Sequence, residues 1–186
     1  MNPERILRCL DSHLTSITRL ILYGRAALSL GFPNPRSEFA TTMDVDAILP
    51  EVELAAVEGD DQFWNAIDAT NEELRDTGLY LTHLFADSQV ILSDDWLENI
   101  VPIESTDFRF LKLRRPATED LLLTKMMRID PQDRSDMEFL LENGSIATRP
   151  QLEALFARAI IPDIPEIQEA FHANADWLRQ KVNTSS

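Results

Sequence analysis

The chain has 186 residues, 44% of them hydrophobic, which is enough for one globular domain with a sizeable core. Its formal net charge of −15 argues against a protein that coats nucleic acid broadly, because such proteins carry excess positive charge. The single cysteine, Cys9, excludes an internal disulfide and a cysteine-rich zinc site, and it suits a reducing compartment.

The chain is expected to be cytoplasmic and to have no membrane partner. Its start is charged within four residues and has no apolar signal core. No apolar run approaches the roughly 18–20 residues that are needed to span a bilayer. The three histidines are scattered along the sequence and show no metal-ligand spacing, so we predict no metal site from them.

The first fifty residues predict a helix, a strand, a short helix and a second strand. Apolar residues at helical spacing favour an amphipathic helix over residues 3–18. The apolar run 20–23 predicts a buried strand, which breaks at Gly24 into a short helix over 25–30. After a loop with two prolines, the second strand is expected over 41–49.

Two carboxylates, Asp44 and Asp46, lie one residue apart in that second strand. A strand directs alternate side chains to opposite faces, so both aspartates are expected on one face. Their repulsion costs stability unless a cation lies between them. Paired carboxylates bind hard divalent ions such as Mg²⁺, and a site with two such ions supports phosphoryl or nucleotidyl transfer.

The remaining elements are predicted from periodicity and from helix-breaking residues. We expect a loop over 51–59, and the following helix begins at Asp60 or Asp61 and ends at Gly78. Strands are expected over 79–85, 89–92, 99–103 and 108–113. Helices are expected over 118–129, 131–142, 149–160 and 165–182.

This order of elements predicts an α+β fold: a small mixed β-sheet with helices on one side and a C-terminal helical extension. Residues 1–116 would form the core with its N-terminal helix, and residues 117–186 a helical part packed on it as a single compact unit. Charge is uneven, since seven basic residues fall between 109 and 134. Two interpretations stay open: a cleft for metal and phosphate, or an acidic surface with one neutralising strand.

Two stretches carry a resemblance to a known family. The order Leu-Ile-Leu-Tyr-Gly24, helix, then Thr-x-Asp44-Val-Asp46-Ala-Ile resembles the opening of the nucleotidyltransferase (polymerase-β-like) superfamily. That superfamily places a Gly-Gly or Gly-Ser turn before a helix and Asp-x-Asp on the next strand. The later stretch EDLLLTKMMRIDPQDRSDMEFLL is similar to the helical motif of AbiEii-like toxin nucleotidyltransferases and of uncharacterised bacterial relatives.

The resemblance implies a site and a reaction. Asp44 and Asp46 would bind Mg²⁺, and the turn of Gly24 and Arg25 would hold phosphate. Three catalytic residues would complete the site: Lys125, Asp133 and Asp136. The reaction implied is transfer of a nucleotidyl group from an NTP to an RNA or protein acceptor. The setting implied is a toxin–antitoxin or phage-defence system, with a cognate toxin or antitoxin as partner.

Three observations keep alternatives open. Lys125 holds triphosphate or transition-state charge in one interpretation, and forms a structural ion-pair network with Asp133 and Asp136 in the other. Arg25 stands where the superfamily has a small residue. The third carboxylate of active members has no clear counterpart, because strand 108–113 carries basic residues instead. The rival hypothesis is a catalytically inactive binding or antitoxin-like module of the same fold.

Overall fold

The computed structural model describes residues 1–104 and 107–184, which group into two compact units. The first unit comprises Met1–Ala86 and Ile100–Arg115, and the second comprises Asp87–Asn99 and the chain from Pro116 onward. The short segment Asp87–Asn99 therefore belongs with the C-terminal helices, although it lies between two parts of the first unit in the sequence.

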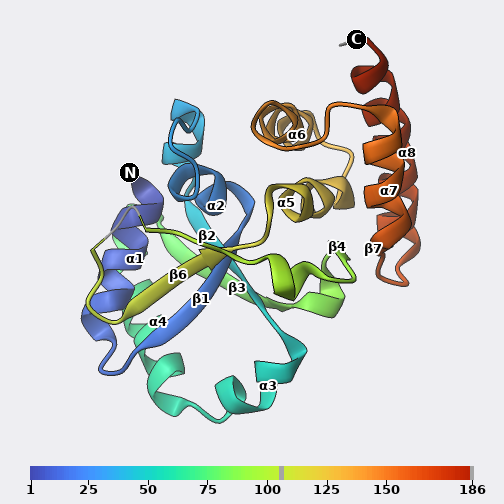
Figure 1. The fold of residues 1–186 in the computed structure, drawn as a ribbon. Helices are drawn as coiled ribbons and strands as arrows, with labels where there is room; N and C mark the ends of the chain where they lie inside the picture. Colours follow the sequence, from blue (N-terminus) through green and yellow to red (C-terminus); the bar gives the residue numbers. More distant parts are fainter. Residues whose placement is uncertain (105–106, 185–186) are drawn as a thin grey trace. The chain divides into compact units, whose positions relative to one another are not determined.

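A five-stranded mixed sheet forms the centre of the first unit (Figure 1). Its order is β3-β2-β1-β6-β5, in which β1 runs antiparallel to β2 and parallel to β6. β2 is parallel to β3, and β5 is antiparallel to β6. The predicted α+β fold with a mixed sheet is confirmed. The strands are β1 (Thr18–Tyr23), β2 (Asp44–Leu49), β3 (Tyr80–Ala86), β5 (Val101–Pro102) and β6 (Leu111–Arg115).

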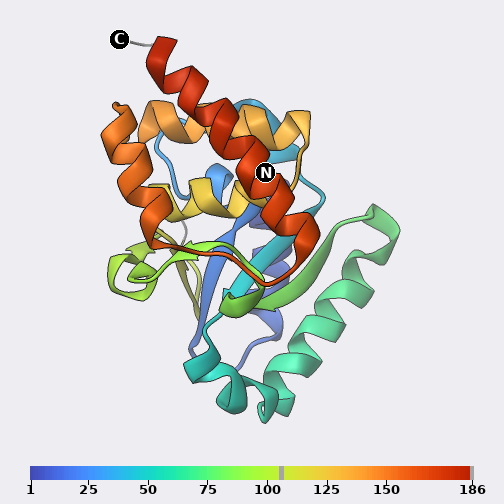
Figure 2. The same cartoon turned by 90° about the vertical axis from the view of Figure 1, so that its right-hand side faces the viewer.

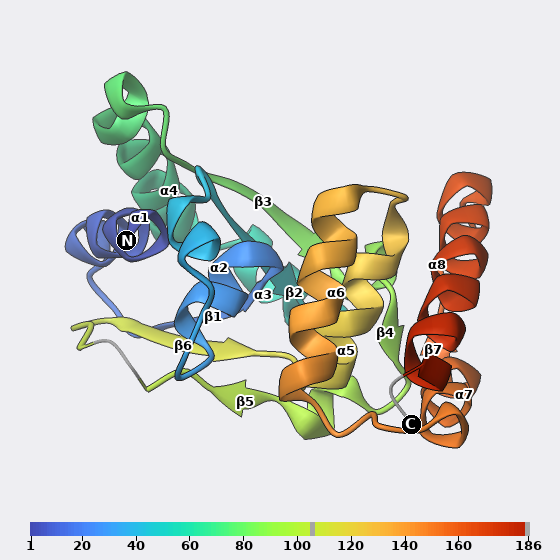
Figure 3. The same ribbon diagram turned by 90° about the horizontal axis from the view of Figure 1, so that it is seen from above.

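Helices of the first unit bury the apolar side chains of these strands. α1 (Asn2–His13) packs against β2 and against α4 (Asp61–Leu74), which also packs on β3 (Figure 3). α2 (Gly24–Leu30) packs against β1 and β2. The 3₁₀ turns η1 (Ser37–Thr41) and η2 (Arg75–Thr77) complete the unit. Fully buried side chains from α1 and from the strands, among them Ile6, Leu7, Leu10, Leu22 and Val45, form the core.

Two expectations about this unit were wrong. The predicted loop 51–59 is a helix, α3 (Glu51–Glu58), which begins after Pro50 and has two acidic residues in its first turn. Those residues favour a helix N-terminus, but α3 buries none of its side chains and so has no apolar stripe that periodicity could detect. The first helix ends at His13 rather than near residue 18, because Leu14 takes an extended conformation.

Asp11 fastens the end of α1 to the segment that leads into β6. Its carboxylate accepts hydrogen bonds from the backbone N–H groups of Arg109, Phe110 and Leu111 at 2.8–2.9 Å. Burial opposes ionisation of this carboxyl, but the three N–H donors outweigh that effect and hold the pKa of Asp11 below its ordinary value.

The second unit is mostly helical. α5 (Thr118–Thr124) packs against α6 (Pro131–Asn143), and α7 (Arg149–Arg158) packs against α8 (Pro165–Thr184), the orange and red helices of Figure 2. A two-stranded sheet pairs β4 (Leu92–Ser93) with β7 (Ala159–Ile160) in antiparallel fashion. The remaining turns are η3 (Asp87–Gln89), η4 (Trp96–Asn99) and η5 (Lys125–Met127).

One buried carboxyl group joins β4 to α5 within this unit. Asp120 accepts a hydrogen bond from the Ser93 N–H at 2.8 Å. Burial raises the pKa of the Asp120 carboxyl, and the hydrogen bonds from Ser93 only partly oppose that rise.

The helix expected over 118–129 is shorter than predicted. It ends at Thr124 and tightens into η5, after which Arg128 is extended. The side-chain amide of Asn174, a fully buried residue of α8, donates to the carbonyls of Met126 and Arg128 at 3.3 and 2.8 Å. This tertiary contact satisfies carbonyls that a continuing helix would have used. Among the residues described, no helix is both long and apolar enough to cross a membrane.

Candidate functional site

The turn between β1 and α2 brings the backbone of Gly24 against the carboxylate of Asp46. Tyr23, the last residue of β1, is the cross-strand partner of Asp46. Gly24 follows with φ +63°, and a Cβ built on it would lie 3.3 Å from Asp46 Oδ2. A side chain here would meet both backbone strain and the aspartate, so the position requires glycine.

Asp44 and Asp46 share one face of β2, as the alternation predicted. Both are half-buried, whereas Val45 and Ala47 between and after them are buried on the opposite face. The Thr42 hydroxyl donates to Asp44 Oδ1 at 2.7 Å and so helps to hold that carboxylate. Carboxylate oxygens from one strand face are a donor set that suits a hard divalent cation.

The Arg25 side chain contacts η1, the 3₁₀ turn that precedes β2. Its guanidinium lies 3.8 Å from Glu38 Oε1 and 5.5 Å from the ring centroid of Phe39. Only 15% of the Arg25 side chain is exposed. The residue that replaces the expected small side chain is therefore folded onto η1, and an anion at the turn would have to compete with Glu38 for it.

The strand register points to a residue of β3 that the sequence did not single out. Asp44 is paired with Tyr80 and Val45 with Leu81, after which the register shifts. Thr82 comes two residues after Tyr80, so strand alternation places it on the face that carries the two aspartates. Its hydroxyl oxygen is buried and has no hydrogen-bond partner among the residues that the structure describes.

The sheet offers two carboxylates in the part of the chain that the structure describes. None of β1, β3, β5 and β6 contains an acidic residue. β6, which overlaps the predicted strand 108–113, pairs with β1 and not with β2, so its residues are not next to Asp44 and Asp46 in the sheet. The sequence has no signal for this pairing order, so Thr82 could not be recognised from it.

The second unit holds a buried cluster of charged side chains made from η5 and α6. Lys125 Nζ lies 3.1 Å from Asp133 Oδ1 and 2.7 Å from Asp136 Oδ2. Arg128 Nη2 lies 2.9 Å from Asp133 Oδ2. Lys125, Asp133 and Asp136 are only 8%, 2% and 0% exposed. The structure thus brings together the three residues that the sequence predicted as a set.

Asp133 lies in the first turn of α6, but it is not the N-cap of that helix. Asp130 is the N-cap of α6 and accepts from the Gln132 N–H at 2.7 Å, which leaves Asp133 free of that task. Two carboxylates face two cations, so the formal charges balance when all four groups are ionised. Such balance is what makes burial of charged groups tolerable in a protein interior.

A mixed sheet in which a glycine turn opens a helix beside a strand with Asp-x-Asp defines a protein of the nucleotidyltransferase fold class. The chain belongs to the family described as nucleotidyltransferase of unknown function (DUF6036), whose model matches residues 4–176. The predicted superfamily is thereby confirmed, whereas the closer likeness to AbiEii-like toxins stays a prediction. No curated protein and no solved structure gave a match.

Proposed function

We propose that the chain transfers a nucleotidyl group from an NTP to a hydroxyl group of an RNA or protein acceptor, with Mg²⁺ bound by Asp44 and Asp46. The observation that carries the proposal is the glycine turn held against Asp46, with Asp44 on the same strand face. Family membership supports the class of reaction.

The two aspartates fit a magnesium site by their chemistry. Both belong to one strand face and are half-buried, so their oxygens remain partly accessible to a cation and its waters. Bound there, Mg²⁺ would neutralise charge on the triphosphate and stabilise the charge that develops in transfer. Gly24 leaves the backbone beside Asp46 uncovered, and Arg25 would contact phosphate in place of Glu38.

The transfer step conserves atoms and charge in a simple way. The acceptor hydroxyl oxygen attacks the α-phosphorus, and a new P–O bond forms. The bond from the α-phosphorus to the bridging oxygen breaks, and pyrophosphate leaves with that electron pair. The hydroxyl proton passes to solvent water. We also propose that Lys125 takes part in the transfer, with Asp133 and Asp136 as the carboxylates that position its ammonium group.

We propose that this transfer serves to control cell growth. Modification of a cellular RNA or protein by such a transferase would arrest growth, which is the activity expected in a toxin–antitoxin or phage-defence system. A cognate toxin or antitoxin would then be its macromolecular partner.

A second candidate is a module of this fold that binds nucleotide without catalysis. The specific observation in its favour is Thr82, a neutral residue on the face of β3 where a third carboxylate would complete the metal site. Such a module would bind Mg²⁺–NTP through the same residues and transfer nothing.

Calorimetric titration with each of the four NTPs, with and without Mg²⁺, tests nucleotide binding. We expect binding that requires Mg²⁺ and that is lost in Asp44→Asn and Asp46→Asn. The matched control is Asp76→Asn, which removes an exposed carboxylate elsewhere in the first unit and should bind normally. Absence of binding, or equal binding by all variants, would overturn both candidates.

Labelled NTP then separates the two candidates. Incubation with total RNA and with total protein should transfer label from the α-phosphate and none from the γ-phosphate. Transfer from the γ-phosphate would indicate a kinase instead. Binding without any transfer would favour the inactive module.

A further inference from the structure

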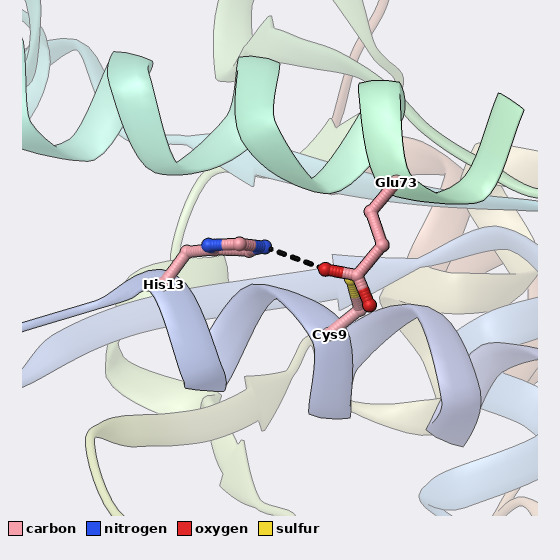
Figure 4. A group of neighbouring side chains, drawn as sticks. All are labelled: Cys9, His13 and Glu73. Atoms are coloured by element: carbon pink, nitrogen blue, oxygen red, sulfur yellow. Dashed lines mark hydrogen bonds and ion pairs between the residues drawn. The ribbon is translucent and has the colours of Figure 1, made fainter.

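Three side chains of different chemistry converge between α1 and α4, and none of them belongs to the set proposed for transfer (Figure 4). Cys9 and His13 stand one helical turn apart on α1, and Glu73 reaches them from α4. The thiol sulfur, an imidazole nitrogen and a carboxylate oxygen all lie within 4.8 Å of one another. His13 Nε2 is already 3.0 Å from Glu73 Oε2.

This donor set is that of a transition-metal site. Thiolate, imidazole and carboxylate are the three protein ligands of Zn²⁺, whose bonds of about 2.0–2.3 Å separate neighbouring ligand atoms by about 3.3–3.6 Å in a tetrahedron. The three ligand atoms, which all lie within 4.8 Å of one another, are close to those separations. Mg²⁺ and Ca²⁺ prefer oxygen ligands, so this cluster differs chemically from the pair Asp44 and Asp46.

Exposure allows an ion to enter from solvent. The His13 and Glu73 side chains are 31% and 61% exposed, whereas Cys9 is buried beneath them. A metal held by all three would have its sulfur ligand on the protein side and an open fourth position toward water. Three protein ligands with an open position form the arrangement found in accessible zinc centres.

Without a metal, hydrogen bonds link the three side chains through Glu73. Burial raises the pKa of the Cys9 thiol, and the charge of Glu73 and a hydrogen bond to it raise that pKa further. A hydrogen bond with Thr70 and the charge of Arg5 oppose these effects. The thiol therefore keeps its proton until a cation replaces it.

We propose that Cys9, His13 and Glu73 form a binding site for Zn²⁺ or a similar divalent transition metal that joins α1 to α4. The ion displaces the thiol proton and takes the place of the hydrogen bond between His13 and Glu73. Because the ion binds the folded unit, it stabilises the packing of these two helices against the sheet.

Cobalt provides a direct test, because the chain has a single cysteine. Co²⁺ bound to thiolate absorbs in the near ultraviolet by charge transfer, so any such band must come from Cys9. Titration of the full chain with Co²⁺ should produce this band with a stoichiometry of one ion per chain. Zn²⁺ should abolish the band by displacement, and excess Mg²⁺ should not. A titration without the band would overturn the proposal.

Variants at the exposed ligands show whether the site is built from all three residues. His13→Gln and Glu73→Gln should each lower the Co²⁺ affinity by more than the roughly 10–100-fold that loss of an outer-shell partner costs. Glu72→Gln is the matched control, since it removes the neighbouring exposed carboxylate, which pairs with Arg75 instead. Equal affinity in His13→Gln, Glu73→Gln and the control would refute the three-residue site.

Thermal unfolding and proton release give independent readouts. Zn²⁺ should raise the melting temperature of the native chain and leave that of His13→Gln unchanged. Calorimetry in buffers of different ionisation enthalpy should detect at least one proton released per ion bound, which a carboxylate-only site would not produce at neutral pH. Nucleotide binding by the His13→Gln variant should be normal, so this result is independent of the function proposed above.

Discussion

Replacing Lys125 with methionine would remove the central cation of the buried cluster in the second unit and keep a side chain of similar length. Asp133 would retain Arg128 at 2.9 Å, but the Arg128 side chain is 70% exposed and so is partly screened by water. Asp136, whose side chain is 0% exposed, would lose the ammonium group that lies 2.7 Å from it.

The size of the effect follows from this burial. Removing one partner of a buried ion pair costs about 3–5 kcal/mol, because the remaining charge is left in the interior. Arg128→Met, the matched control, removes a cation that also contacts Asp133 but is mostly exposed, and should cost less than about 1 kcal/mol. The two variants should therefore differ by at least about 2 kcal/mol in the free energy of unfolding.

Urea unfolding followed by circular dichroism measures both free energies. A loss for Lys125→Met no larger than that for Arg128→Met would refute the view that the cluster stabilises the second unit. Nucleotide transfer by Lys125→Arg separates stability from catalysis, since arginine keeps the charge but alters its geometry. A stable variant without activity would support the proposed role of Lys125 in transfer.

Three further changes have expected outcomes that equilibrium unfolding can check. Gly24→Ala should cost about 1–2 kcal/mol, from a positive φ and the nearby Asp46 carboxylate, whereas Gly59→Ala, with no heavy atom closer than 3.6 Å to its Cβ, should be nearly neutral. Asp11→Asn should cost about 1.5–3 kcal/mol at pH 7. Because the pKa of Asp11 is lowered by folding, its stabilisation exists above the unfolded pKa of about 3.9 and should vanish as pH falls through the folded value. Asp120→Asn should be neutral or stabilising at pH 7, since folding raises the pKa of Asp120 and its ionisation costs stability as pH rises; a clear loss would contradict this sign.

Local sequence signals were sufficient for most of the elements. The apolar run before Gly24 was sufficient to predict β1. Gly24 marked the turn into α2, because glycine adopts a positive φ far more readily than other residues. Asp130 and Pro131 gave the start of α6 correctly, because a cap and a first-turn proline act within one helical turn. Features decided within a few residues were thus predictable.

Features that depend on distant partners were not predictable from one sequence. Thr82 falls on the face of the two aspartates only because β3 pairs with β2, and the register shift there leaves no trace in hydropathy. Glu73 joins Cys9 and His13 across about sixty residues, and only the packing of α1 on α4 brings it there. The spacing of Cys9 and His13 alone suits one helix face, but two possible ligands are too few to indicate a metal site.

The pairing of β4 with β7 has a consequence for the way the protein is made. Asp87–Asn99 leaves the ribosome long before Ala159–Ile160, with which its strand must pair. During synthesis, the sheet of the first unit can form once β6 has been synthesised. At that stage β4 has no partner strand, because β7 has not yet been made. A fragment that begins at Pro116 would lack β4 and the Ser93 N–H that Asp120 requires. The second unit should therefore be produced in isolation only when residues 87–99 are supplied with it.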